Sequence, residues 1–267
     1  PPNVFMNYSD NIWTKEFTNR FTQAYVHCYK TEFQEVYNPL FGGAIYATYS
    51  QLVLNRTKII NCQACMGGGI FLLNGDLIFS DGRVEKTTAY YMGGGICMLS
   101  TKSDILQSHL IPNSPFASDY HFAFIYRSTF SFTISYFAFG GILLDHVNNI
   151  VIDGCSFFRG ETIFTGGAIG IIGPTNNNYD EEDEEYTSPI ISNCVFLYNY
   201  IYLQTEKLNH TRSYWALFSS HTKSYHTNKW LNKNVENRIR KGGAAIAVYN
   251  CSYLYTEKCY FYGNVVN

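Results

Sequence analysis

A short glycine-rich phrase returns six times along the chain, and it constrains the fold more than any other feature. Each copy holds a glycine pair and an isoleucine that opens an apolar run, as in FGGAIYA and FTGGAIGII. The six isoleucines are Ile45, Ile70, Ile96, Ile142, Ile169 and Ile246. The first three, and again the fourth and fifth, follow one another at intervals of about 25 residues, which is a period typical of solenoid repeats.

The two longer intervals, from Ile96 to Ile142 and from Ile169 to Ile246, are interpreted as two periods each. HFAFIY, from His121, is then a degenerate copy of the phrase inside the first long interval. YWALFSS, from Tyr214, is a copy inside the second, which also holds insertions. With these two copies the chain contains about eight repeats.

A cysteine phrase recurs at a fixed offset from the isoleucine. The cysteines of DGCSFFRG and EKCYFYGN follow the isoleucine of their own repeat at the same distance along the chain. The cysteine of SNCVFLYN stands at that offset too, once the insertion TNNNYDEEDEEY is subtracted. Equivalent positions of stacked repeats lie above one another. We therefore predict a ladder of cysteines, with a looser copy at its first member: Cys62, Cys155, Cys194 and Cys259.

Between these landmarks the chain consists of short strand-like runs separated by Gly, Asn or Asp. One repeat reads GGAIYATYS, QLVLNRT and KIINCQA, and another reads GGILLDH, NNIVIDG and CSFFRG. Alternating apolar positions in such runs indicate strands that bury one face. A leucine-rich horseshoe needs an LxxLxLxxN phrase that this chain lacks, and a β-sandwich would not repeat one phrase at this period. We predict an all-β fold, a parallel β-helix of about eight three-sided coils.

The glycine pairs are interpreted as one corner of every coil. Glycine adopts positive φ without strain, so a pair can turn the chain sharply before the next strand. The predicted corner residues are Gly42, Gly43, Gly68, Gly69, Gly94, Gly95, Gly140, Gly141, Gly166, Gly167, Gly242 and Gly243.

Two four-residue phrases also connect the chain with a known family. GGA[ILV] occurs at Gly42–Ile45 and Gly166–Ile169, and FxxN occurs at Phe196–Asn199 and Phe261–Asn264. This pair resembles the repeat pair of polymorphic outer-membrane proteins and related autotransporter passengers. Other copies depart from the pattern, since Gly160 stands where Asn is expected. The resemblance implies a right-handed β-helix that is exposed at a cell surface and linked to adhesion.

The sequence divides into a short first segment and a long repeat region. Residues 28–267 are predicted to be the β-helix, with insertions near 174–188 and 221–241. One insertion is acidic and the other is basic, so they are either solvated loops or a docking pair between neighbouring rods. Residues 1–27 are either a degenerate first coil or a cap, since four apolar residues have helical spacing: Ile12, Trp13, Phe17 and Phe21.

Composition narrows the setting of the protein. The net charge of −2 gives no dominant basic face for nucleic acid, and no run of about 18 apolar residues could span a membrane. The eight cysteines are even in number, which is compatible with an oxidising compartment. We expect an extracellular or cell-surface protein without cofactor or metal, glycosylated at four sequons: Asn7, Asn55, Asn209 and Asn250.

Two functions follow from this pattern. The first is a structural or adhesive protein that associates head to tail through open coil ends, or binds other surface proteins or glycans. The alternative is a polysaccharide-binding or polysaccharide-cleaving β-helix, because LLDHVNNIVIDGCSF is similar to strand phrases of pectate-lyase-like proteins. The sparse acids Asp76, Asp145 and Asp153 form no ladder in the sequence, so no catalytic residue is predicted.

Overall fold

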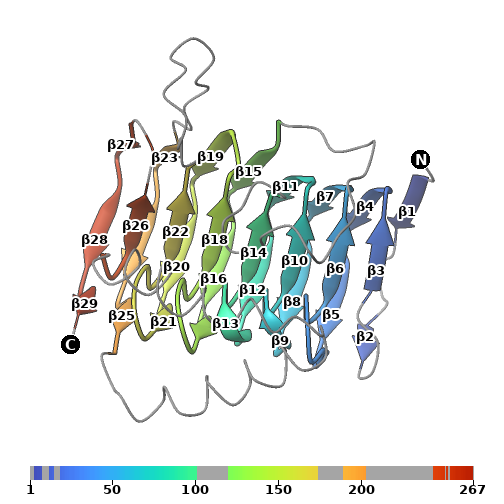
Figure 1. Ribbon diagram of the computed structural model, residues 1–267, viewed down its shortest axis with the longest axis horizontal. Coiled ribbons are helices and arrows are strands. Elements are labelled where there is room, and N and C mark those ends of the chain that lie inside the picture. The colour runs from blue at the N-terminus through green and yellow to red at the C-terminus, as the bar shows by residue number, and fades with distance from the viewer. Residues whose placement is uncertain are drawn as a thin grey trace, which may run out of the picture.

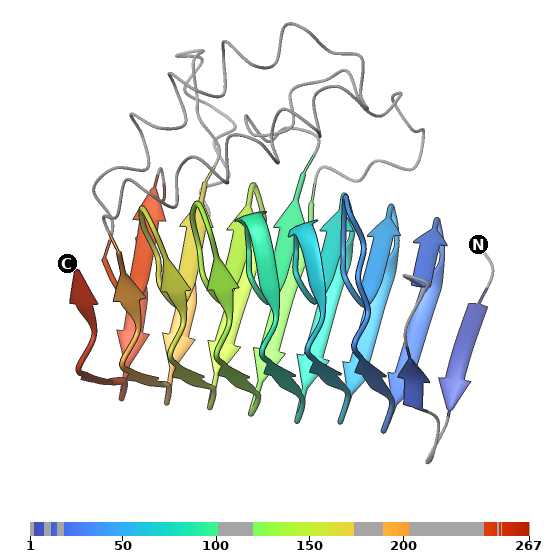
Figure 2. The same cartoon turned by 90° about the horizontal axis from the view of Figure 1, so that it is seen from below.

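The chain folds as a rod of stacked coils (Figure 1). The computed structural model describes residues 3–7, 12–14, 19–100, 120–173, 189–202, 243–249, 251 and 253–266. The regular elements within these ranges are strands, and every strand pairing is parallel. The first and last strands lie at opposite ends of the rod (Figures 1 and 2). No described helix has the length and apolarity needed to cross a membrane.

Four parallel sheets run along the rod, and they are called sheets A to D. Sheet A contains β1 (Asn3–Asn7), β4 (Tyr25–Tyr29), β7 (Gln51–Asn55), β11 (Asp76–Ser80), β15 (Phe122–Tyr126), β19 (Asn149–Asp153), β23 (Ile190–Ser192) and β27 (Tyr255–Glu257). Sheet B contains β2 (Ile12–Thr14), β5 (Glu32–Gln34), β8 (Lys58–Ile60), β12 (Arg83–Glu85), β16 (Thr129–Ser131), β20 (Ser156–Phe158), β24 (Val195–Leu197) and β28 (Tyr260–Tyr262).

The other two sheets complete the coil. Sheet C contains β3 (Asn19–Thr22), β6 (Ile45–Thr48), β10 (Ile70–Leu73), β14 (Ile96–Leu99), β18 (Ile142–Asp145), β22 (Ile169–Ile172) and β26 (Ile246–Tyr249). Sheet D contains β9 (Gln63–Met66), β13 (Thr88–Met92), β17 (Ile134–Ser135), β21 (Glu161–Thr162), β25 (Tyr200–Ile201) and β29 (Val265–Val266). One coil therefore runs through sheets C, A, B and D and returns to sheet C.

The predicted parallel β-helix is confirmed, and the isoleucines of the glycine phrase form one ladder. Ile45, Ile70 and Ile96 pair in register in sheet C, and the same ladder continues through Ile142, Ile169 and Ile246. Their side chains point into the core, which is why one apolar residue recurs at the same place in every coil.

The interpretation of the interval from Ile96 to Ile142 as two periods is wrong. Ile96 pairs directly with Ile142, so the interval is a single coil that holds additional residues. HFAFIY is strand β15 of sheet A, where it pairs with β11 and β19 and takes no part in the isoleucine ladder. Ile169 likewise pairs directly with Ile246. YWALFSS lies outside the described residues.

The coil has one strand more than the three sides predicted. GGAIYATYS, QLVLNRT and KIINCQA supply strands of sheets C, A and B, as expected. The end of the third run begins a fourth strand, β9, which belongs to sheet D. Strands of sheet D are as short as two residues, so they leave almost no periodic signal in the sequence.

The described residues of the first segment are strands rather than a capping helix. Strand β1 pairs with β4, β2 pairs with β5 and β3 pairs with β6. Each of these pairings continues a sheet of the rod, so this stretch follows the path of a coil through sheets A, B and C.

The corner glycines have two separate tasks. The first residue of the phrase has positive φ, as at Gly42 (59°) and Gly166 (64°). In the GGGI copies this residue is Gly67 or Gly93, one position before the predicted pair. In FGGI it is not glycine at all, because Phe139 adopts a φ of 62°. The prediction that the glycine pair makes the turn through positive φ is therefore wrong at these copies.

The second glycine of the phrase is required by the distance between coils. A Cβ atom on Gly68 would lie 2.3 Å from the carbonyl oxygen of Gly94, and one on Gly94 would lie 2.1 Å from that of Gly140. Both contacts are far inside van der Waals distance and involve backbone atoms. Glycine at this position lets successive corners stack.

The core is a column of stacked side chains. Phe130, Phe157 and Phe196 occupy equivalent places in sheet B, with ring centroids 5.0 Å apart and nearly parallel planes. All three are buried, and such aromatic pairs contribute about 1 kcal/mol each beyond burial of their area. A second buried cluster lies on the outward side of sheet C, where Phe71, Leu73 and Leu143 pack with residues of the D–C corner.

The stacking requirement predicts a large effect for Gly68→Ala. The added Cβ must displace the backbone of the next coil, so we expect a loss of about 3 kcal/mol in the free energy of unfolding. Gly69→Ala is the milder comparison, because its Cβ would lie 2.8 Å from the carbonyl oxygen of Gly95 and alanine already occupies this position as Ala44 and Ala168; we expect a clearly smaller loss. Denaturant unfolding measures both, and equal losses would contradict the assignment.

Candidate functional site

The corner between sheets A and B carries a ladder of small hydrogen-bonding side chains. Six of its seven positions donate to the carbonyl oxygen two residues earlier in the chain. For Ser128 the acceptor is Tyr126, and for Cys155 it is Asp153, at 2.7 and 3.4 Å. The seven equivalent residues are Thr31, Thr57, Gly82, Ser128, Cys155, Cys194 and Cys259. Hydroxyl and thiol thus serve one structural purpose here.

Cys62 is not a member of this ladder. It follows strand β8 rather than preceding it, and its thiol donates to the carbonyl of Ile60 at 3.3 Å at the corner between sheets B and D. The predicted ladder therefore contains Cys155, Cys194 and Cys259 but excludes Cys62. The longer offset of Cys62 from Ile45, compared with the offset shared by the other copies, is the sequence signal of this difference.

The three stacked cysteines are free thiols with different environments. Cys155 and Cys194 are fully buried, and Cys259 is partly exposed. The pKa of Cys155 is raised, first because its thiol hydrogen-bonds to Cys194 and second because it is buried. The pKa of Cys194 is lowered, mainly because it receives that hydrogen bond.

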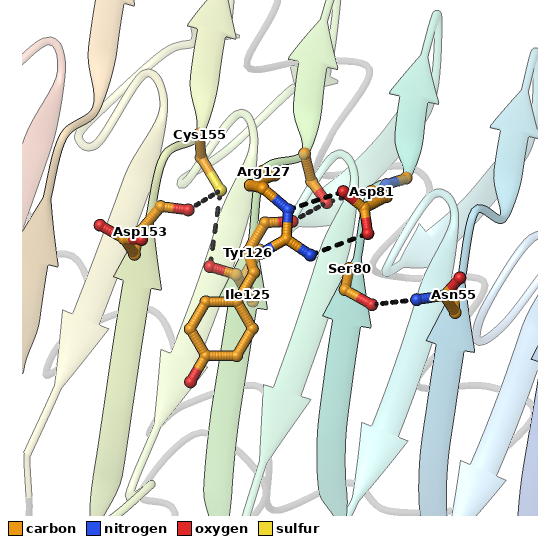
Figure 3. A network of polar contacts seen from close by, with 10 residues as sticks. Asn55, Ser80, Asp81, Ile125, Tyr126, Arg127, Asp153 and Cys155 are labelled. Atoms are coloured by element: carbon orange, nitrogen blue, oxygen red, sulfur yellow. Dashed lines mark hydrogen bonds and ion pairs between the residues drawn. The ribbon is translucent and has the colours of Figure 1, made fainter.

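Charged residues line the solvent side of the same corner (Figure 3). Asp81 and Arg127 occupy equivalent places one coil apart, both with positive φ, and the guanidinium donates two hydrogen bonds to the carboxylate at 2.7 and 2.9 Å. These hydrogen bonds lower the pKa of Asp81 and raise that of Arg127. Beside them, the Asn55 amide donates to Ser80 at 2.8 Å.

Asp153 extends this polar edge by one coil. Its carboxylate accepts hydrogen bonds from Asn193 at 2.6 Å and from Ser192 at 2.7 Å. Both contacts lower the pKa of Asp153, with a smaller contribution from the charge of Arg127. Its carboxylate is thus held by neighbours of the rod and is not presented as a free acid.

An aromatic row follows the corner between sheets B and D. Four rings meet edge to face in succession, with interplanar angles of 86–87°. The guanidinium of Arg159 lies 5.5–5.6 Å from the centroids of the first two rings. Two members of the row are exposed at 38% and 54% of their surface, and the other two are half-buried. The aromatic row consists of Phe132, Phe158, Tyr198 and Tyr262.

The FxxN phrase places one residue in each of two ladders. Phe196 and Phe261 stack in the core at 4.8 Å, while Asn199 and Asn264 lie at the B–D corner. The Asn199 amide donates to Asn264 at 2.7 Å, and its oxygen accepts from the backbone of Gly160 at 2.8 Å. Asn199 thereby bridges the coil in which Gly160 replaces asparagine.

The last described coil exposes side chains whose equivalents are buried elsewhere. Phe261 is 47% exposed, whereas Phe196 below it is 0% exposed. Strands β26, β27, β28 and β29 each stand last in their sheets, so one edge of each has no paired strand within the described residues. Large apolar residues exposed in this coil are Tyr253, Leu254, Tyr255, Tyr260, Phe261, Tyr262, Val265 and Val266.

The acids weighed as catalytic groups are not brought together. Asp145 is fully buried and lies 2.6 Å from Nδ1 of His146. Asp76 is the first residue of β11 in sheet A and accepts a hydrogen bond from the backbone N–H of Phe122. Asp153 is the last residue of β19 in the same sheet, so it lies at the opposite corner. Within the described ranges no three His, Cys, Asp or Glu side chains are grouped to hold a metal ion.

Two of the four predicted glycosylation sites, Asn7 and Asn55, lie in described strands. Asn55 is half-buried and its amide is bonded to Ser80, while the sequon residue Thr57 is fully buried. A glycan at Asn55 would have to break this ladder contact. Asn7 lies in strand β1. Three predicted features lie outside the described residues: Asn209 and Asn250, Gly242, and the insertions near 174–188 and 221–241.

Comparisons of the chain with protein-family models, with curated proteins and with solved structures give no match. The assignment of a parallel β-helix therefore rests on the strand pairings of the four sheets. The resemblance to polymorphic outer-membrane proteins and autotransporter passengers remains a prediction from the two short phrases.

The contact between Asp81 and Arg127 predicts a pH effect. Because the folded carboxyl has a pKa below its ordinary value of 3.8, the contact stabilises the fold above that value and is lost as pH falls through the folded pKa. In Arg127→Gln the pKa of Asp81 should return toward 3.8. Carboxyl NMR titration measures it. Arg83→Gln is the control, and an unchanged Asp81 pKa in Arg127→Gln would contradict the assignment.

Proposed function

We propose that the protein is an extracellular structural or adhesive module that assembles through the end of its coil stack. The arrangement of the side chains in the rod supports this proposal. Side chains inside the rod are engaged in ladders, and the carboxylate of Asp153 is held by its neighbours. This arrangement suits a scaffold better than a catalyst.

One observation carries the proposal, namely the in-register parallel pairing of successive coils, as in the stacked rings of Phe196 and Phe261, which a further coil can continue. Exposed strand edges pair readily with another strand, and the flat apolar end offers area to bury when they do. The occupant that fits is a coil of a second copy, which would continue the same ladders. Such a head-to-tail contact does not close on itself and generates a filament.

The test is the state of association of the chain and of Phe261→Lys. We expect the original chain to form longer species as concentration rises, because each contact buries the end coil. Phe261→Lys places a charge at the centre of that contact and should keep the chain monomeric. Analytical ultracentrifugation and negative-stain imaging measure both properties.

Phe124→Lys is the matched control, because Phe124 lies on the lateral face of sheet A and packs against Phe122. It should assemble like the original chain. An original chain that stays monomeric at millimolar concentration, or equal loss in both variants, would rule out association through the coil end.

The aromatic row favours a second function, the binding of polysaccharide. Exposed rings offer flat apolar faces to sugar rings, and the cation of Arg159 could pair with a uronate carboxylate. Cleavage would require two carboxylates facing each other across a bond, and Asp76, Asp145 and Asp153 each lie in separate contacts. Of the two polysaccharide functions, we therefore propose binding of an acidic polysaccharide and not its cleavage.

Affinity electrophoresis in polygalacturonate tests this second function. Tyr198→Ala removes an exposed ring of the row and should weaken retardation about tenfold or more, as expected for a loss of about 1.4 kcal/mol. Tyr126→Ala, on sheet A, should leave retardation unchanged. If Tyr198→Ala is retarded as much as the original chain, or if no chain is retarded, the aromatic row is excluded as a binding site for the polysaccharide.

A further inference from the structure

We propose that Cys194 and Cys259 form a disulfide across two coils when the chain meets a low-molecular-weight disulfide of the glutathione class. The inference is independent of the assembly and polysaccharide proposals. It concerns the A–B corner, where these two thiols occupy equivalent places in successive coils.

The register brings the two cysteines together. Val195 pairs with Tyr260, and the backbone N–H of Tyr260 donates to the carbonyl of Cys194 at 2.8 Å. Residues at equivalent places in neighbouring parallel strands are about 4.8 Å apart, which falls within the Cα separation that a disulfide spans. The Cys259 thiol also points toward the coil that contains Cys194. Its Sγ lies 3.4 Å from the carbonyl oxygen of Ile191 in that coil.

Access selects this pair among the three thiols. Cys259 is partly exposed, so a dissolved disulfide reaches it, whereas Cys155 and Cys194 are buried. Cys194 lies between Cys155 and Cys259 and is within reach of both. Its lowered pKa supports a role as the attacking thiolate once Cys259 has been modified. Cys155 is one coil too far from Cys259 to compete.

The chemistry is ordinary thiol–disulfide exchange in two steps. The Cys259 thiolate attacks the glutathione disulfide, giving a mixed disulfide and one molecule of glutathione thiol. The Cys194 sulfur then attacks the Cys259 sulfur and releases the second glutathione, whose thiolate takes up the Cys194 proton. The two protein thiols are oxidised by two electrons in total, and the reagent is reduced to two thiols.

The consequence is a covalent clip on the last described coil. The bond would tie the corner before β28 to the corner before β24, closing the long segment between the two cysteines into a loop. Closing a long loop stabilises mainly by restricting the unfolded chain. The clip therefore secures the coil whose ladder residues are half exposed.

The test treats the folded full-length chain with glutathione disulfide, blocks free thiols and maps peptides under non-reducing conditions. We expect a cross-linked peptide pair holding Cys194 and Cys259, lighter than the separate peptides by two hydrogen atoms. The melting temperature should rise by about 5 °C and return on reduction. A link through Cys155, or a mixed disulfide that persists at Cys259, would overturn the assignment.

Serine variants provide controls that keep the fold. Ser128 occupies the same ladder and donates to the same backbone position as the cysteines, so serine fits this corner. Cys194→Ser and Cys259→Ser should abolish both the link and the rise in melting temperature. Cys155→Ser should retain both, and loss of the link in Cys155→Ser alone would contradict the chosen pair.

Discussion

In-register parallel pairing between coils is the constraint on which the whole structure depends. Each residue of an inner strand pairs with the equivalent residues of the two neighbouring coils, so its surroundings repeat along the rod. A side chain that fits once can therefore be used again, and the core becomes ladders of isoleucine and phenylalanine. The same constraint is severe at the corners, where a Cβ on Gly68 or Gly94 would meet the next backbone. The chain therefore tolerates a change of residue type within a ladder more readily than a change in the distance between coils.

Phe139 shows how the two demands of a corner can be separated. It holds the positive φ that glycine holds at Gly42, Gly67, Gly93 and Gly166, a conformation that costs about 1–3 kcal/mol for a residue of this size. Its ring is fully buried against Gly170, where a Cβ would lie 1.8 Å from the ring. Burial of the ring offsets the strain, and the missing side chain of Gly170 provides the space. At this corner the turn position accepts a phenylalanine because Gly170 leaves room for the ring, whereas at Gly68 and Gly94 a Cβ would meet the backbone of the next coil.

The sequence predicts the fold class because ladder residues are repeated literally, as the six isoleucines and the FxxN phrases show. It does not predict the count of residues between ladders, since a long interval can hold either two coils or one coil with an insertion. That ambiguity misplaced HFAFIY, and it also hid the contact between Asp81 and Arg127, which are neighbours only if a single coil separates them. The aromatic row was hidden for a related reason. Its members alternate between a strand end and the following corner, so no single offset connects them.

The position of the extra residues indicates how such a rod can vary without losing its core. Residues 101–119 and 174–188 follow strands β14 and β22 of sheet C, and residues 203–242 follow strand β25 of sheet D. All three therefore enter the sequence at corners, between strands whose registers with the neighbouring coils are kept. An insertion between two strands leaves the registers of both strands unchanged, whereas an odd number of residues inserted inside a strand would shift every later side chain of that strand to the opposite face. Corners, outward rows and the end coil are thus the places where this fold can acquire binding properties while its ladders remain unchanged.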